Sequence, residues 1–177
     1  MVGQGKLIPP EEESYNHGAR TCRVGKDGML CVTVDQAHNV LPRDKLKLYD
    51  EVGIGGIVLM NAFDGSKREV FACGIRNSVG MAFYTGKKFP ANYRGGFFLA
   101  QHDSWNRTSP IGARIMFTNL KADGSGDKTE VFAEGWLDAE TRQYHGCPVD
   151  VADWPDVSIL VSGDFAGAIY RISYTGP

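Results

Sequence analysis

The chain has 177 residues, of which 42% are hydrophobic and 23% are charged, so it is long enough for one ordinary domain with its own core. The formal net charge of −2 gives no electrostatic reason to expect nucleic acid or an anionic membrane as a partner. No apolar run approaches the roughly 20 residues that a helix needs to cross a bilayer, so no membrane span is predicted. The first residues lack the apolar core of a secretory signal, so either the protein is cytoplasmic or a leader precedes this sequence.

Short runs rich in Val, Ile, Phe and Tyr follow one another along the chain, separated by glycine and turn residues about every eight to twelve positions. This pattern predicts an all-β fold. No segment keeps apolar residues at helical spacing over the length of a helix. The charged stretch 44–51 is expected to be a loop, and residues 138–144 are expected to form at most one short helical turn.

The strand pattern repeats in three units, at about 15–74, 75–135 and 145–174. The first two units end alike, on Glu-Val-Phe-Ala, one further residue and Gly (69–74 and 130–135). Each unit supplies three strands, and the first two add a fourth after Asp-Gly-Ser, which is the make-up of a propeller blade. The prediction is a single β-propeller-type domain over residues 1–177, with residues 1–14 as candidates for the missing strand of the third blade.

Three blades are too few to close a ring, since propellers typically have four to eight. The chain is therefore expected to be a piece of a larger protein, half of a six-bladed ring that pairs with a second copy, or an open stack of sheets. Open strand edges and apolar blade faces favour association. We therefore expect a homodimer or a larger assembly.

A polar motif, His-Asp-Ser-Trp-Asn-Arg at 102–107, directly follows an apolar run that is typical of a buried strand. Arginine pairs with carboxylates through two parallel bonds, and indole offers a face for stacking. The motif thus favours a pocket for a flat, anionic, aromatic ligand. The four cysteines show no C-x-x-C spacing, so neither a zinc site nor a redox motif is predicted, and a disulfide is left open.

Four blocks carry a family resemblance: Asn-His-Gly-Ala-Arg (16–20), Gly-Ile-Arg-Asn-Ser-Val-Gly-Met-Ala-Phe (74–83), the motif at 102–107, and Gly-Asp-Phe-Ala-Gly-Ala-Ile-Tyr-Arg-Ile (163–172). Together they resemble the soluble sugar dehydrogenases that use pyrroloquinoline quinone (PQQ), and within them the L-sorbosone dehydrogenase-like branch. The resemblance runs from about Tyr15 onward. It implies a six-bladed propeller with the quinone at the mouth of the central channel, assisted by calcium, in a periplasmic or secreted protein.

The same resemblance implies oxidation of a sugar hydroxyl or a hydrated aldehyde by hydride transfer to the quinone. His17 matches the general base, because an imidazole titrates near working pH. The residues that match the family's cofactor contacts are Arg76, Asn77, His102, Trp105 and Arg107.

This sequence departs from the family pattern in two places. It lacks the segment that carries the family's calcium-binding loop, and it has Cys147 where the family usually has an arginine that grips the quinone. Carboxylates after the strands, at Asp35, Asp103 and Asp164, are alternative calcium ligands, since calcium prefers oxygen. Carboxylates in propeller loops more often cap turns than bind calcium.

Two other functions remain open from the sequence. Six-bladed propellers also host calcium-dependent lactone hydrolases, in which a metal polarises the carbonyl and a histidine or carboxylate activates water. A non-catalytic propeller that binds a carbohydrate or a partner chain, or nothing, is the third hypothesis, because the fold alone does not fix the function.

Overall fold

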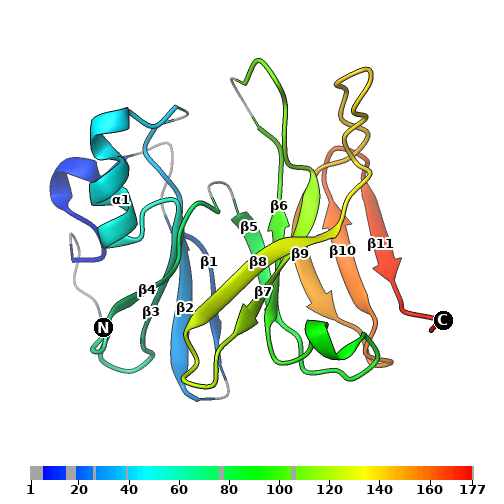
Figure 1. Cartoon of the computed structure of the whole chain (residues 1–177), viewed down its shortest axis with the longest axis horizontal. Helices are drawn as coiled ribbons and strands as arrows, with labels where there is room; N and C mark the ends of the chain where they lie inside the picture. The colour runs from blue at the N-terminus through cyan, green and yellow to red at the C-terminus, as the bar shows by residue number, and fades with distance from the viewer. Residues whose placement is uncertain are drawn as a thin grey trace. The chain divides into compact units, whose positions relative to one another are not determined.

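The computed structural model describes residues 6–14, 19–25, 27–38, 40–75, 78–104 and 107–176. The chain divides into two compact units, Met1–Asn77 and Ser78–Pro177. The described strands form three antiparallel sheets, two with four strands and one with three (Figure 1). The prediction of an all-β fold built from propeller blades is confirmed. Among the described residues, no helix has the length and the apolar character needed to cross a membrane.

The sheet of Met1–Asn77 is a meander in which each strand pairs with the next along the chain. Its strands are β1 (Ala19–Val24), β2 (Met29–Val34), β3 (Gly56–Asn61) and β4 (Glu69–Ala72). Val32 of β2 lies opposite Val58 of β3, and both are buried. Apolar side chains on one face of the pleat therefore meet in a core.

A helical segment covers this core, at the place where the sequence predicts a loop. The 3₁₀ helices η1 (Pro10–Glu12) and η2 (Arg43–Lys45) accompany helix α1 (Leu46–Val52). The loop prediction for 44–51 is wrong because one face of α1 is apolar: Tyr49 is fully buried, and Leu48 and Val52 pack beside it. Gly53 ends the helix in the left-handed conformation, and its N–H donates to the Tyr49 carbonyl.

A buried carboxylate joins these helices. Glu12 of η1 accepts hydrogen bonds from Lys45 Nζ at 2.7 and 2.8 Å and from the Tyr49 hydroxyl at 2.8 Å. Burial and the Glu12 carboxylate together raise the pKa of Tyr49 to about 12. The described part of the N-terminus, residues 6–14, contains no strand, and Leu7 and Ile8 pack against the core of this unit.

The unit Ser78–Pro177 contains the other two sheets. The first consists of β5 (Ser78–Phe83), β6 (Phe97–Gln101), β7 (Arg114–Leu120) and β8 (Gly126–Ala133), with the 3₁₀ helix η3 (Ala91–Tyr93) before β6. The second consists of β9 (Pro148–Asp153), β10 (Ile159–Gly163) and β11 (Ala168–Ile172). Residues 138–144 contain the predicted single helical turn, in which the Arg142 N–H donates to the Asp138 carbonyl, and a bridge between Leu137 and Tyr144 closes the segment. The Asp138 carboxylate also accepts the N–H groups of Glu140 and Thr141.

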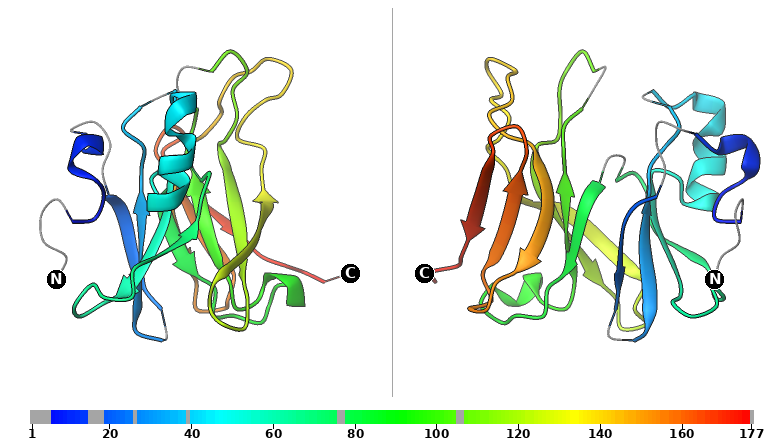
Figure 2. Two further views of the ribbon diagram at one scale, coloured as in Figure 1. Left: turned by 60° about the vertical axis from the view of Figure 1, so that its left-hand side comes forward. Right: turned by 180° about the vertical axis from the view of Figure 1, so that it is seen from behind.

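The two sheets of this unit pack face to face, with β9 next to β5 and β6, as the right-hand view of Figure 2 shows. Phe98 and Phe117 of the first sheet and Val151 and Val161 of the second share one buried cluster. Gly80 of β5 permits the approach, since a Cβ at this position would collide with the backbone of Asp150 and its neighbour. The strand ends of neighbouring blades are thereby held close together.

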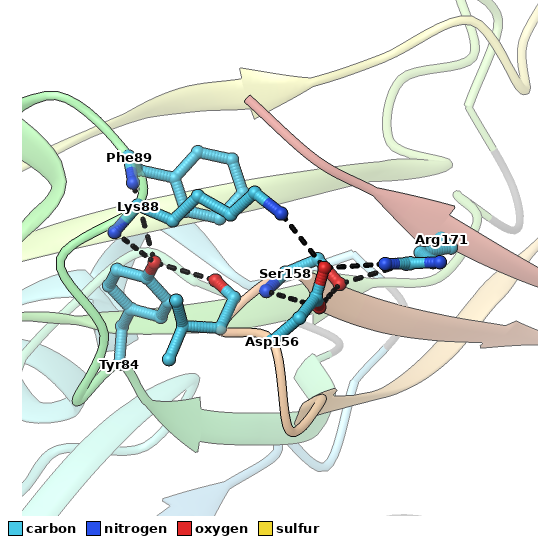
Figure 3. A network of polar contacts seen from close by, with 7 residues as sticks. Tyr84, Lys88, Phe89, Asp156, Ser158 and Arg171 are labelled. Carbon is cyan, nitrogen blue, oxygen red and sulfur yellow. Dashed lines mark hydrogen bonds and ion pairs between the residues drawn. The ribbon is translucent and has the colours of Figure 1, made fainter. Parts of the chain in front are cut away.

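A polar network, drawn in Figure 3, joins the two sheets at the side where β5 and β9 end. Asp156, in the turn between β9 and β10, accepts from Lys88 Nζ at 2.8 Å and from Arg171 of β11. The Tyr84 hydroxyl, at the end of β5, donates to the Val157 carbonyl at 2.7 Å. The candidate site lies at the opposite ends of the strands, where β6 and β10 end.

Candidate functional site

The candidate site lies where three chain segments of Ser78–Pro177 meet, at the side of the two sheets where β6 and β10 end. One segment is the loop 102–113 that leaves β6, the second precedes β9, and the third is the turn between β10 and β11. Because two antiparallel sheets pack against each other here, the ends of their strands bring together residues that are distant in sequence. Four side chains meet here, and they are called the His102 cluster: His102, Asp103, Cys147 and Asp164.

His102 lies between two carboxylates. Its Nδ1 is 3.0 Å from Asp103 Oδ1, and its Nε2 is 3.0 and 3.2 Å from the two oxygens of Asp164. Burial lowers the pKa of His102, but the hydrogen bonds to Asp103 and Asp164 outweigh this effect and raise the pKa above its usual value. Both ring nitrogens donate only in the imidazolium, so this arrangement stabilises the charged form.

Asp164 holds both the imidazole of His102 and the turn that begins at Asp164 itself. Its carboxylate accepts the backbone N–H of Phe165 at 2.6 Å, and its own N–H donates to the Cys147 carbonyl at 3.3 Å. Desolvation acts against ionisation of Asp164, but the contact with His102 keeps the pKa of this carboxyl below its ordinary value. The His102–Asp164 contact therefore joins the edges of the two sheets through an ion pair.

Cys147 is the buried member of the cluster, with 3% of its surface exposed. Burial, followed by the charges of Asp103 and Asp164, raises the pKa of its thiol to about 11, so the thiol is neutral at pH 7. One ligand atom each of His102, Asp103 and Cys147 lie within 4.8 Å of one another. The cluster thus combines imidazole nitrogen, carboxylate oxygen and sulfur in a space that suits a metal ion.

Tyr144 holds the loop that begins with the cluster. Its hydroxyl accepts from the Ser104 N–H at 3.0 Å and donates to the Ile111 carbonyl at 3.1 Å. The Ser104 hydroxyl lies 2.9 Å from the same oxygen and accepts the Ile111 N–H at 2.8 Å. Ala113 closes the loop with φ of 47°, and its N–H donates to the His102 carbonyl. This loop therefore has a defined conformation at both ends.

A groove of about 300 Å³ opens beside the same loop. Its wall combines apolar surface from Ile111 and Leu137 with the charged side chains of Arg114 and Glu134. Arg114 Nε also donates to Gln101 Oε1 at 2.6 Å, which orients the guanidinium. The groove has the size of a small ligand site and both donors and acceptors on its wall.

The structure brings together only some of the residues predicted from the sequence. His102 lies in the cluster, whereas Arg107 is exposed and its Nε donates within its own loop, to the Ser109 carbonyl at 3.3 Å. Asp103 and Asp164, predicted as alternative calcium ligands, both contact His102, while Asp35 belongs to the unit Met1–Asn77. The other predicted site residues, His17, Arg76, Asn77 and Trp105, lie outside the described residues.

Two functional features were not anticipated from the sequence. Tyr144 lies in a stretch predicted only as a turn, and no local spacing connects its hydroxyl with a loop more than 30 residues earlier. Cys147 stands out as a departure from a family pattern, but its closeness to His102 follows only from the packing of the two sheets.

The described residues fit a bound quinone in part. PQQ carries carboxylates, and the exposed guanidinium of Arg107 is suited to pair with one of them. Cys147 offers no positive charge at pH 7, because its thiol stays protonated. Asp103 and Asp164 add negative charge, which the imidazolium of His102 only partly offsets.

No known family model matches the chain. A protein of Borreliella burgdorferi described as an uncharacterized protein is 38% identical to it over 99 residues, which make up 54% of this chain and 25% of that protein. This chain therefore spans about a quarter of the length of the relative. The solved PQQ domain of pyranose dehydrogenase from Coprinopsis cinerea is similar over 92% of this chain and 71% of that one, with a TM-score of 0.47 and 13% sequence identity.

Proposed function

We propose that this chain takes part in the PQQ-dependent oxidation of a sugar or an aldehyde. The observation that supports the proposal is the loop 102–113, whose motif carries the family resemblance and whose described ends are held by hydrogen bonds. His102 at its start is held by two carboxylates, and Arg107 in its middle leaves a guanidinium exposed. Polar groups that are already held in place at the ends of the loop bind an anionic aromatic ligand at a lower entropic cost.

The quinone, when bound, supplies an acceptor for the hydride that leaves the substrate carbon. The residues of this chain have the complementary tasks of binding, orientation and proton transfer. In the proposal His17 takes the hydroxyl proton, Arg76 and Asn77 hold the polar edge of the ligand, and Trp105 stacks on it. Arg107 pairs with a carboxylate through its planar fork.

His102 acts in this proposal as a fixed cation rather than as a base. Both of its nitrogens are occupied by carboxylates, and its pKa is raised, so it is poorly suited to take a proton from a substrate at neutral pH. Its role is to hold the loop in place through Asp164, across the two sheets.

The groove beside the loop is the candidate substrate site. Arg114 and Glu134 present donors and acceptors for hydroxyl groups, and Ile111 and Leu137 offer apolar surface for the face of a sugar ring. Such a mixed wall favours a small polyhydroxylated substrate over a purely apolar one.

The test is dye reduction by the whole chain, supplied with PQQ, calcium, an artificial electron acceptor and a panel of aldoses and aldehydes. We expect PQQ-dependent reduction that falls at least 100-fold in His17→Ala. His145→Ala, which removes an exposed histidine outside the cluster, is the matched control and is expected to retain the activity.

Three outcomes count against the proposal. Full activity in His17→Ala would show that His17 is not the general base. Acid release from a lactone without added quinone would favour the calcium-dependent hydrolase instead. No activity in either assay, together with no thermal shift on adding PQQ, would favour a propeller that binds a carbohydrate or a partner chain without catalysis.

A further inference from the structure

The cluster that holds His102 contains a buried thiol that neither the loop nor the proposed oxidation uses. Cys147 is 3% exposed and free of any disulfide. One ligand atom each of His102 and Asp103 lies within 4.8 Å of its sulfur, and the charges of Asp103 and Asp164 act on the thiol. Cysteine sulfur, imidazole nitrogen and carboxylate oxygen are the ligands that zinc takes in proteins.

We propose that His102, Asp103 and Cys147 form a binding site for Zn²⁺ or a similar divalent transition metal. The inference does not depend on the proposed oxidation, since it concerns a metal site that no quinone chemistry requires. The three residues come from two segments of Ser78–Pro177 that the packing of the sheets brings together.

The geometry needs only a small contraction. The three ligand atoms lie within 4.8 Å of one another. With Zn–S near 2.3 Å and Zn–N near 2.0 Å at tetrahedral angles, neighbouring ligand atoms are about 3.3 to 3.6 Å apart. Rotation of side chains about χ1 and χ2 covers a difference of this size without moving the strands.

Nδ1 of His102 is the nitrogen assigned to the metal. It already faces Asp103 Oδ1 at 3.0 Å, so a cation between them replaces a proton. Nε2 faces Asp164 on the other side of the ring at 3.0 Å. A carboxylate that accepts the second ring N–H fixes the tautomer and the orientation of a metal-bound histidine, and Asp164 is placed to do this.

The donor set selects the metal. Nitrogen, sulfur and oxygen together suit zinc, whereas calcium prefers six to eight oxygen ligands and does not favour sulfur. Three protein ligands leave a fourth tetrahedral position for water, as in catalytic zinc sites. Binding converts the Cys147 thiol to the thiolate and removes the proton on Nδ1, so protons are released as the metal enters.

The experiment uses the full chain in a Cys22→Ser/Cys73→Ser background, which removes the two exposed thiols that bind metal nonspecifically. Zn²⁺ is titrated calorimetrically, and Co²⁺ serves as a spectroscopic probe of sulfur ligation. We expect one ion per chain and a thiolate-to-cobalt charge-transfer band in the near ultraviolet. Cys31→Ser, which changes the other buried cysteine, is the matched control and should keep the band.

The variants separate ligands from positioning residues. Cys147→Ser should abolish the band, and His102→Gln or Asp103→Asn should weaken binding at least tenfold. Asp164→Asn should weaken binding about 10- to 100-fold while keeping the band, because it acts through the imidazole. If Cys147→Ser does not fold, the His102 and Asp103 variants carry the test.

The proposal is overturned if the background protein binds no Zn²⁺, if the band persists in Cys147→Ser, or if the His102 and Asp103 variants bind as tightly as their parent. None of these measurements contains quinone or sugar. Failure here therefore leaves the proposed oxidation to its own test, and loss of dye reduction leaves the metal site unaffected.

Discussion

The Tyr144 hydroxyl offers the sharpest test of how the candidate site is held in place. It accepts from the Ser104 N–H, contacts the Ser104 hydroxyl and donates to the Ile111 carbonyl. Tyr144→Phe removes all of these contacts and keeps the ring in place. We therefore expect the loop 102–113 to open more often, with little change in the packing of the sheets.

The magnitude follows from three neutral hydrogen bonds at about 0.5 to 1.5 kcal/mol each, reduced because water reaches a half-buried site. Tyr144→Phe should therefore lower the free energy of local opening by about 1 to 3 kcal/mol, which corresponds to a roughly 5- to 150-fold rise in the open population. Native-state hydrogen exchange at the Ser104 and Ile111 amides measures this directly, because both amides donate within the network.

Tyr174→Phe is the matched control, since Tyr174 is an exposed tyrosine near the C-terminus. Equal protection of the two loop amides in Tyr144→Phe and Tyr174→Phe would refute the idea that this hydroxyl fixes the loop. A fall in global stability equal to the local effect would contradict it as well, because it would mean that the loop does not open separately from the sheets.

Three further predictions concern the sheet pair of Ser78–Pro177. Gly80→Ala should destabilise the unit by about 1 to 3 kcal/mol in urea denaturation, since its Cβ meets backbone that cannot retreat, and an unchanged midpoint would contradict this close approach. Phe98→Ala should cost about 3 to 5 kcal/mol in the same assay, because the ring is fully buried against Phe117 at 4.9 Å between centroids. The hydrogen bond from Lys88 holds the pKa of Asp156 below its usual value, so its stabilisation is present above about pH 4 and is lost as the pH falls through the lowered pKa. Thermal melting of Asp156→Asn from neutral to acid pH should show a shallower acid decline than the parent, and parallel curves would contradict this assignment.

The sheets could be predicted from the sequence because strand signals are local. Alternating apolar residues and the Asp-Gly turns place β1 to β11 close to their observed positions, and the repeated Glu-Val-Phe-Ala ending corresponds to the outer strands β4 and β8. Helix α1 was missed because its apolar face consists of only three side chains, Leu48, Tyr49 and Val52. That face is recognisable only when the buried carboxylate of Glu12, more than 30 residues earlier, is placed beside it.

The candidate site could be predicted only in part, for a related reason. His102 stands out in the sequence because a polar motif directly follows an apolar strand. Its partner Asp164 is 62 residues away, and Cys147 lies before a different strand, so no spacing rule joins them. The prediction of no zinc site depends on C-x-x-C spacing, which tests only for ligands on one short segment, and it stays a prediction until Zn²⁺ binding is measured.

Charge counting separates the two proposals. Without metal, the imidazolium of His102, the carboxylates of Asp103 and Asp164 and the neutral thiol of Cys147 sum to −1. With Zn²⁺, the metal contributes +2, the imidazole becomes neutral and the thiol becomes a thiolate, so the sum is again −1. Metal binding therefore does not turn the cluster into a site that attracts an anionic quinone.

The two ligands should consequently respond to pH in opposite directions. As the pH rises through the raised pKa of His102, the metal-free cluster changes from −1 to −2, which weakens the binding of an anion. The same change leaves Zn²⁺ one proton fewer to displace, so its affinity increases. Titrations of PQQ and of Zn²⁺ between about pH 6 and pH 9 should therefore give affinities that diverge. His102→Gln should flatten the PQQ curve and make the Zn²⁺ curve less steep at the acid end, where only the rise from the Cys147 thiol then remains. Parallel curves in the parent protein would mean that His102 does not set the charge that either ligand meets.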